Sequence, residues 1–259
     1  MSAPITPVTQ TVAEGVARLT WDPEENVDVI RRTVALALTT HHRVEALVAP
    51  DDDRAQRIAT FSGMHREGVM RGITVDGRQV DRIVYARVDT DLPAQDPEGF
   101  RTLLNSFLPR KRAVGQMLIR DPEQRVLLCQ MTYKSDWDLP GGVVEVNESP
   151  ALAVVREVEE ELSLTIPAHA LLLTDWLPPW SGWDDALCLV FDGGEHPASI
   201  AAEVVPQARE IATAEFCTLE QVDERCADFT ARRIRAAVAR SRGDGQPYTE
   251  SGRWLSEER

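Results

Sequence analysis

The chain has 259 residues, of which 43% are hydrophobic and 27% are charged, an ordinary balance for a globular protein. Its formal net charge of -14 argues against a general affinity for nucleic acid or for an anionic membrane, because both need a basic surface on the protein. No segment resembles a transmembrane span or a secretory signal, so we expect a cytoplasmic protein whose cysteines are reduced and mostly structural, namely Cys129, Cys188, Cys217 and Cys226.

The first third of the chain predicts a small α/β unit. Residues 1–12 are polar, and we expect them to be loose. The expected elements are a strand over 15–21, a helix over 26–42, a strand over 42–48, a helix over 51–63 and a hairpin over 68–88. The hairpin prediction depends on Asp76-Gly77, a pair that strongly favours a two-residue turn.

The composition changes after this hairpin. Residues 89–112 contain three prolines and end in the basic cluster Arg110-Lys111-Arg112. This cluster could bind a phosphate or could simply be solvated. We therefore place an N-terminal domain at 1–92, a linker at 93–112 and a second domain at 113–259. In that second domain we expect strands over 113–121, 125–131, 170–177, 186–194 and 211–219, an acidic helix that begins at Ser149-Pro150, and two C-terminal helices. This order is typical of a mixed sheet with helices packed on it, an α/β (α+β) fold.

The acidic helix carries an unusual density of carboxylates. Residues 141–164 read GGVVEVNESPALAVVREVEEELSL. Four side chains fall at i, i+1, i+4 and i+5 and so share one face: Arg156, Glu157, Glu160 and Glu161. An acidic run is usually a solvated face. Several carboxylates share a small region without mutual repulsion when a divalent cation neutralises them, so the sharper interpretation is a cation site.

This segment resembles the Nudix box, G-x5-E-x7-R-E-U-x-E-E-x-G-U, in which U is a bulky aliphatic residue. Eight of the nine defined positions match: Gly142, Glu148, Arg156, Glu157, Val158, Glu160, Glu161 and Leu164. Ser163 stands where the motif has its last glycine. That glycine usually ends the helix in a left-handed conformation, so a serine there should destabilise the protein by roughly 1 kcal/mol or shift the helix cap. The resemblance covers roughly residues 110–230 and implies a MutT-like Nudix α/β/α sandwich with a mixed sheet.

The resemblance also implies a metal site and a reaction. The reaction is hydrolysis of a diphosphate that joins a nucleoside to another group, with Mg2+ or Mn2+ as the cofactor. The implied metal ligands are Glu157, Glu160, Glu161 and the Gly142 carbonyl, with Glu148 binding through water or orienting Glu157. Arg156 would brace these carboxylates. The substrate would be a nucleotide-type small molecule: ADP-ribose, a nucleotide sugar or a nucleoside triphosphate.

The general base is left open among three glutamates. Glu157 is one candidate, and Glu210 or Glu215, which follow the box, are the others. Candidate substrate-binding residues are four tryptophans, because a nucleobase readily stacks on an aromatic face, although such rings more often fill a core: Trp137, Trp176, Trp180 and Trp183.

Residues 15–90 resemble the C-terminal half of a GNAT acetyltransferase of the ribosomal-protein-acetylating type. The resemblance rests on His42 to Glu45, Gly63-Met64, Arg66 to Gly68, Arg71, Asp76-Gly77, Asp81 and Tyr85. The turn expected to hold the coenzyme A diphosphate reads Trp21 to Asn26, with no glycine and three acids, and would repel phosphate. We therefore expect a truncated, non-catalytic GNAT-like half-domain that serves a homodimer or shapes the Nudix cleft.

Three functions stay open at this stage. The first is a metal-dependent Nudix pyrophosphohydrolase. The second is an acyltransferase or a bifunctional enzyme, against which the missing diphosphate loop counts. The third is a ligand-sensing protein that binds without turnover, and the complete set of helix carboxylates counts against it.

Overall fold

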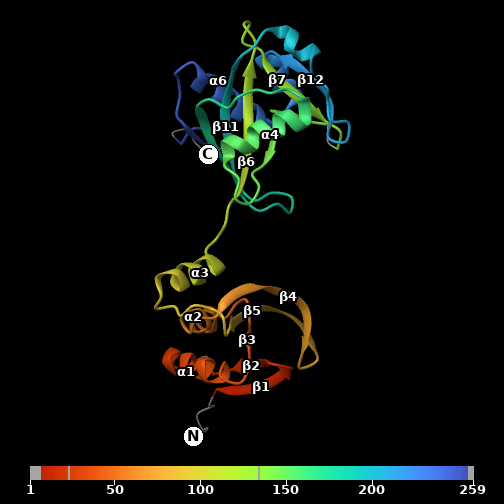
Figure 1. Ribbon diagram of the computed structural model, residues 1–259. Helices are drawn as coiled ribbons and strands as arrows, with labels where there is room; N and C mark the ends of the chain where they lie inside the picture. The colour runs from red at the N-terminus through yellow and green to blue at the C-terminus, as the bar shows by residue number, and fades with distance from the viewer. Residues whose placement is uncertain (1–6, 23, 134, 256–259) are drawn as a thin grey trace. The chain divides into compact units, whose positions relative to one another are not determined.

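A computed structural model describes residues 7–22, 24–133 and 135–255 (Figure 1). The chain divides into two compact units, Met1–Pro109 and Arg110–Arg259. Each unit has its own sheet and its own hydrophobic core. Among the residues that the structure describes, no helix combines the length and the apolar composition needed to cross a bilayer.

The N-terminal unit is a five-stranded sheet with helices. Its elements are β1 (Val8–Ala13), β2 (Val16–Thr20), α1 (Val27–Ala37), β3 (Arg43–Val48), α2 (Asp53–Phe61), β4 (His65–Val75), β5 (Arg78–Val88) and α3 (Pro97–Phe107). The strand order is β1-β2-β3-β5-β4, with β2 and β3 parallel and the other pairs antiparallel. Helices α1 and α2 share a core with β2, β3 and β5, so the sheet and both helices bury one continuous apolar layer.

The sequence predicted most of these elements, and the exceptions are the N-terminus and α3. The prediction of an irregular segment at 1–12 falls outside the described residues for 1–6 and is wrong for 8–12, which belong to strand β1. Every side chain of β1 is exposed, so no buried face imposes an alternation that the sequence could reveal. The turn at Asp76-Gly77 is confirmed: both residues have positive φ, 50° and 76°, as a two-residue turn matching the strand twist requires.

Helix α3 occupies much of the segment expected to be a linker. Asp96 caps its first turn, and Pro97 takes the first helical position, where its missing N–H is harmless. The Ser106 hydroxyl accepts a hydrogen bond from the backbone N–H of Arg66 on β4 at 3.1 Å. The helix therefore packs on the N-terminal sheet, and that unit extends to Pro109.

The C-terminal unit has a mixed eight-stranded sheet. Its elements are β6 (Arg112–Arg120), β7 (Val126–Met131), β8 (Trp137–Asp138), β9 (Gly141–Val143), α4 (Pro150–Leu162), β10 (Leu171–Leu177), β11 (Ala186–Glu195), the 3-10 helix η1 (Ala198–Ala202), β12 (Ile211–Cys217), α5 (Leu219–Arg225), α6 (Asp228–Ser241) and β13 (Tyr248–Glu250). The main strand order is β12-β7-β6-β11-β10-β13, with β8 on β7 and β9 on β6. The pair β6 and β11 is parallel, as is the pair β10 and β13.

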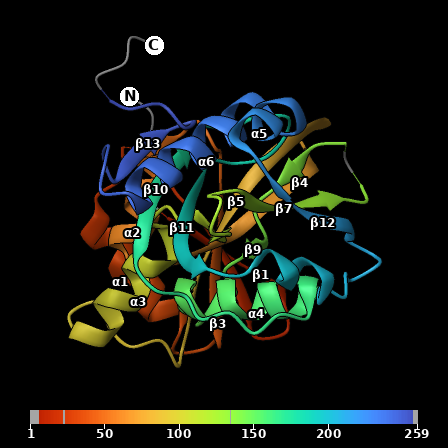
Figure 2. The same cartoon turned by 90° about the horizontal axis from the view of Figure 1, so that it is seen from above.

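Helices cover both faces of this sheet. Met117 and Ile119 of β6 pack into the cluster that contains the buried residues of α4, whereas Leu118 between them packs into the cluster of α6. Figure 2 shows α4 and α6 on opposite sides of β11. The α/β fold class, a sandwich with a mixed sheet, is thus confirmed. The four cysteines are buried: Cys129, Cys188, Cys217 and Cys226.

Helix α4 begins and ends at the residues that the sequence indicated. The Ser149 hydroxyl accepts the N–H of Leu152 at 3.3 Å. At the other end Ser163 is left-handed, with φ 57° and ψ 28°, and its N–H donates to the Glu159 carbonyl. The cap is therefore not shifted, and the serine adopts the conformation that favours glycine. Its hydroxyl donates to the Val205 carbonyl at 3.2 Å.

We expect Ser163→Gly to raise the free energy of unfolding by up to about 1 kcal/mol, because glycine takes the left-handed conformation without strain. The lost hydroxyl bond offsets roughly 0.5 kcal/mol or more of this gain. Ser163→Ala keeps the strain and loses the bond, so it should be less stable than the wild type. Urea unfolding of the three proteins checks both values. A glycine variant less stable than the alanine variant would contradict the strain argument.

Candidate active site

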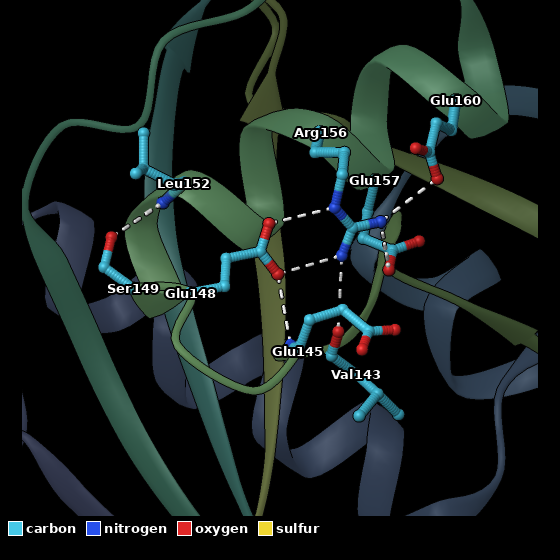
Figure 3. Close-up of polar contacts among 8 residues, drawn as sticks. All are labelled: Val143, Glu145, Glu148, Ser149, Leu152, Arg156, Glu157 and Glu160. Atoms are coloured by element: carbon cyan, nitrogen blue, oxygen red, sulfur yellow. Dashed lines mark hydrogen bonds and ion pairs between the residues drawn. The ribbon is translucent and has the colours of Figure 1, made fainter.

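Arg156 lies among the carboxylates of α4 and the preceding loop (Figure 3). Its Nε and Nη2 donate to the two carboxylate oxygens of Glu148 at 2.9 and 3.1 Å. Its Nη1 donates to Glu157 and to Glu160, each at 3.0 Å. The bond with Glu148 contributes most to raising the pKa of Arg156, and it holds the pKa of Glu148 below its usual range. The guanidinium thus fixes three box carboxylates relative to one another.

Glu161 faces inward from the same helix, and no described arginine forms an ion pair with it. It is 4% exposed, and one of its oxygens accepts the backbone N–H of Gly141 at 2.9 Å. Burial above all, and then the charges of Glu157, Glu210 and Asp138, raise its pKa to about 8. Burial also raises the pKa of Glu157, against the opposing effect of Arg156. Two neighbouring carboxylates are therefore held in a region that disfavours their charge.

The glycines before α4 allow this approach. A Cβ built at Gly142 would lie 2.6 Å from Oε1 of Glu157, so any larger residue would push that carboxylate away. Gly141 has φ 137° and lies so close to β6 that a Cβ would overlap the Gly115 carbonyl. Strand β9 therefore brings the Gly142 backbone next to Glu157, where the sequence placed a carbonyl ligand.

The structure separates the two glutamates that follow the box. Glu210, just before β12, is exposed, and its charge raises the pKa of both Glu157 and Glu161. Glu215 instead forms an ion pair with Arg225 at 2.8 Å. Glu210 is thus grouped with the box carboxylates, and Glu215 has another partner.

Two further residues belong near this group and were missed. The charges of Glu161 and Glu210 add to partial burial in raising the pKa of Tyr133, in the loop after β7. The charge of Asp138 on β8 also raises the pKa of Glu161. Neither position carries a spacing signal, because loop folding brings both residues to the helix.

Trp137 and Trp176 already have partners elsewhere. Trp137 is buried, and the Arg225 guanidinium stacks over its ring at 4.5 Å from the centroid. The Trp176 indole N–H donates to Asp185 at 3.0 Å. Neither contact involves a box carboxylate, so substrate binding by these two rings stays a prediction.

Trp180 and Trp183 project from the loop between β10 and β11. Trp180 packs on Phe229 with ring centroids 5.9 Å apart and lines a cavity of about 250 Å³ whose lining includes no box carboxylate. Trp183 is exposed, with the Arg112 guanidinium 4.5 Å over its ring. Lys111 pairs with Asp185 of the same loop. The basic cluster is therefore largely engaged by this loop, and the structure does not bring these rings to the acidic group.

The described residues contain no group of three or more His, Cys, Asp or Glu side chains gathered to hold a metal ion. Arg156 takes the place of a cation for Glu148, Glu157 and Glu160. The donor set nevertheless fits a hard divalent cation, because it consists of oxygens and two of its carboxylates have raised pKa values that a bound cation would lower.

The raised pKa of Glu161 makes the stability of the metal-free protein depend on pH. A glutamate with an ordinary pKa of 4.5 that titrates near 8 when folded keeps its proton in the folded state over this interval and loses it on unfolding. The free energy of unfolding therefore falls as pH rises through the interval.

In EDTA we expect the midpoint of thermal unfolding to fall between about pH 5 and pH 8, and added Mg2+ to restore it most at the upper end, where the carboxylate is ionised. Glu161→Gln should remove most of the slope. A midpoint in EDTA that is equally pH-dependent in the wild type and in this variant would contradict the assignment.

Parts of the chain are similar to known proteins. Residues 109–238, half of the chain, match the family model of the NUDIX domain. The 8-oxo-dGTP diphosphatase of Proteus vulgaris is 33% identical over 69 residues, which cover 25% of this chain and 62% of that protein. The octanoyltransferase of Myxococcus xanthus is 38% identical over 81 residues, which cover 27% of this chain and 23% of that protein.

Among solved structures, the MutT protein from Methanosarcina mazei Go1 is similar with a TM-score of 0.43 and 24% identity, over 54% of this chain and 99% of that one. The chain spans less than two thirds of the length of the two curated relatives. The resemblance of residues 15–90 to a GNAT acetyltransferase is not shown by these matches and stays a prediction.

Proposed function

The chain belongs to the NUDIX domain family, and from this premise we propose that it is a metal-dependent pyrophosphohydrolase of nucleotide-type diphosphates. Family members generally use divalent metals such as Mg2+. The observation that carries the proposal is the pair Glu157 and Glu161, a half-buried and a buried carboxylate with raised pKa values beside the Gly141-Gly142 backbone. A protein that only binds a ligand would gain nothing from this repulsion.

Each residue then has a chemical task. Glu157, Glu160, Glu161 and the Gly142 carbonyl would hold the metal. A bound metal would neutralise charge on the phosphate and lower the pKa of water. Arg156 holds Glu148, Glu157 and Glu160 in place through four hydrogen bonds to their carboxylates. Glu210, exposed and next to the group, accepts a proton from the attacking water.

The substrate class is proposed as a nucleoside diphosphate linked to another group. One curated relative is named for 8-oxo-dGTP, which places nucleoside triphosphates in the test set beside ADP-ribose and nucleotide sugars. The net charge of -14 gives no general attraction for such anions. Binding must therefore rest on the metal and on local basic groups.

For the rest of the chain we propose a non-catalytic GNAT-like half-domain at 1–92, a connecting segment at 93–112 that contains α3, and a homodimer. In the turn before α1, the Glu24 N–H donates to the Asp22 carboxylate at 2.8 Å, and the Asn26 side chain caps the helix by accepting from Asp28. The Asp22 carboxylate would repel a coenzyme A diphosphate, and the N–H groups of Glu24 and Asp28 already have partners, which supports a module without acyl transfer.

The test is product release from ADP-ribose, UDP-glucose, a dinucleoside tetraphosphate, dGTP and 8-oxo-dGTP, each with Mg2+, with Mn2+ and with EDTA. We expect a mononucleotide product in the presence of metal and none in EDTA. Tight binding of these compounds without turnover under any metal condition would favour a ligand-sensing protein instead.

A further inference from the structure

The N-terminal unit contains a cavity of about 290 Å³ between α2, the facing parts of β4 and β5, and the end of α3. Its lining includes Arg57, Thr60, Phe61, Arg66, Tyr85 and Phe107. All of these residues lie within the one compact unit that ends at Pro109. The cavity is therefore separate from the carboxylates of the C-terminal unit.

The cavity has two cationic side chains without carboxylate partners. Four other arginines of this unit form ion pairs: Arg18 with Glu45, Arg31 with Asp28, Arg43 with Glu67 and Arg54 with Glu24. Among the described residues, no carboxylate lies within ion-pair distance of Arg57 or Arg66. Asp53 is the one acid of the lining, and it is exposed. In a chain with a net charge of -14, this local excess of positive charge favours an anionic ligand.

Tyr85 provides a polar group that is buried at this site. It is 2% exposed, and burial raises its pKa while hydrogen bonds with Thr60 and Arg66 act in the opposite direction. Its hydroxyl therefore stays neutral and able to donate. A hydroxyl beside guanidinium groups is a common arrangement for phosphate or carboxylate oxygens.

Two phenylalanines form the apolar part of the lining. Phe61 is 60% exposed and Phe107 is 37% exposed. A single exposed phenylalanine is ordinary, but two of them in one cationic cavity offer surfaces for a ring. The volume lies at the lower end of ligand sites, which suits one ring with one anionic group better than a dinucleotide.

We propose that this cavity binds a small aromatic anion, a ring that carries a phosphate or a carboxylate. The anionic group contacts Arg57, Arg66 and the Tyr85 hydroxyl, and the ring lies against Phe61 and Phe107. This gives the N-terminal unit a ligand of its own. The proposal does not depend on hydrolysis in the C-terminal unit.

The test uses the full chain in EDTA with AMP and 4-hydroxybenzoate as probes for the two anionic groups, and adenosine as the uncharged comparison. Hydrogen exchange measured by mass spectrometry locates binding, and calorimetry gives the affinity. We expect at least one of the anions to protect peptides covering 53–66 and to bind more tightly than adenosine. No protection of these peptides by either anion, or equal affinity for AMP and adenosine with 4-hydroxybenzoate inactive, would overturn the proposal.

Matched variants make the assignment specific. Arg57→Gln, at an exposed position of α2, should weaken binding by about tenfold or more, because a charge-assisted hydrogen bond is lost. Arg54→Gln, on the same helix but paired with Glu24 outside the lining, should change nothing. Phe61→Leu should weaken binding severalfold, and Phe100→Leu, an exposed residue of α3 outside the lining, should not. Equal loss in Arg54→Gln and Arg57→Gln would refute the site.

Discussion

Glu161→Gln is expected to lower metal-dependent hydrolysis by about a hundredfold or more, because it removes a proposed charged metal ligand and with it several kcal/mol of charge stabilisation. The same change should stabilise the metal-free protein above neutral pH. Glutamine resembles the protonated carboxyl that burial favours, and its side-chain oxygen can still accept the Gly141 N–H. Activity and stability should therefore move in opposite directions.

The matched control is Glu159→Gln, which removes the same charge two residues earlier. Glu159 is exposed, is not part of the box motif, and contributes only its backbone carbonyl to the Ser163 cap. It should keep nearly full turnover. The measurement is kcat and KM for the best substrate over a Mg2+ titration, with urea unfolding in EDTA. Equal losses of turnover in the two variants would mean that general acidity of the helix, and not a metal ligand, explains the activity.

Arg233→Met is expected to destabilise the C-terminal unit by about 3–5 kcal/mol, since it leaves the buried Asp175 carboxylate without its counterion. Arg233 is 2% exposed and lies 3.4 Å from Asp175 and 3.5 Å from Asp138. Asp175 is fully buried and also accepts from the Thr249 hydroxyl and the Gly252 N–H. The arginine thus connects α6 to β8, β10 and the C-terminal segment.

Arg235→Met on the same helix provides the comparison. Arg235 pairs with Asp223, but the two side chains are 42% and 50% exposed, so its loss should cost about 0–1 kcal/mol. Tryptophan fluorescence during urea unfolding measures both effects, because five of the six tryptophans lie in the C-terminal unit. If the two variants were equally stable, the buried network would contribute little net free energy.

The periodic elements could be predicted because their signal is local. The alternation in β3 and the helical stripe of α1 reflect a buried face, which shapes the sequence at every second or every third to fourth position. Strand β1 has no buried face, and β13 has three residues and pairs with β10, more than seventy positions earlier. Such strands depend on partners that are distant in the chain, and no local pattern marks them.

The candidate site divides in the same way. The spacing of Arg156, Glu157 and Glu160 on one helix placed them together in advance, and the hydrogen bonds of Arg156 show them together. The sequence left Glu210 and Glu215 as equal alternatives. Their difference arises because β12 brings Glu210 towards the helix carboxylates and Glu215 to Arg225 on α5.

The sequence by itself determined the family motif, the helix that carries the motif, and the two ends of that helix. Each of these features depends on residues within about twenty consecutive positions. The tertiary structure alone decided which carboxylates are buried, which tryptophans have partners elsewhere, and which arginines of the N-terminal unit lack a carboxylate partner. Burial and ion pairing depend on groups from separate elements. A linear pattern names such groups, and only the packed chain determines their charge environment.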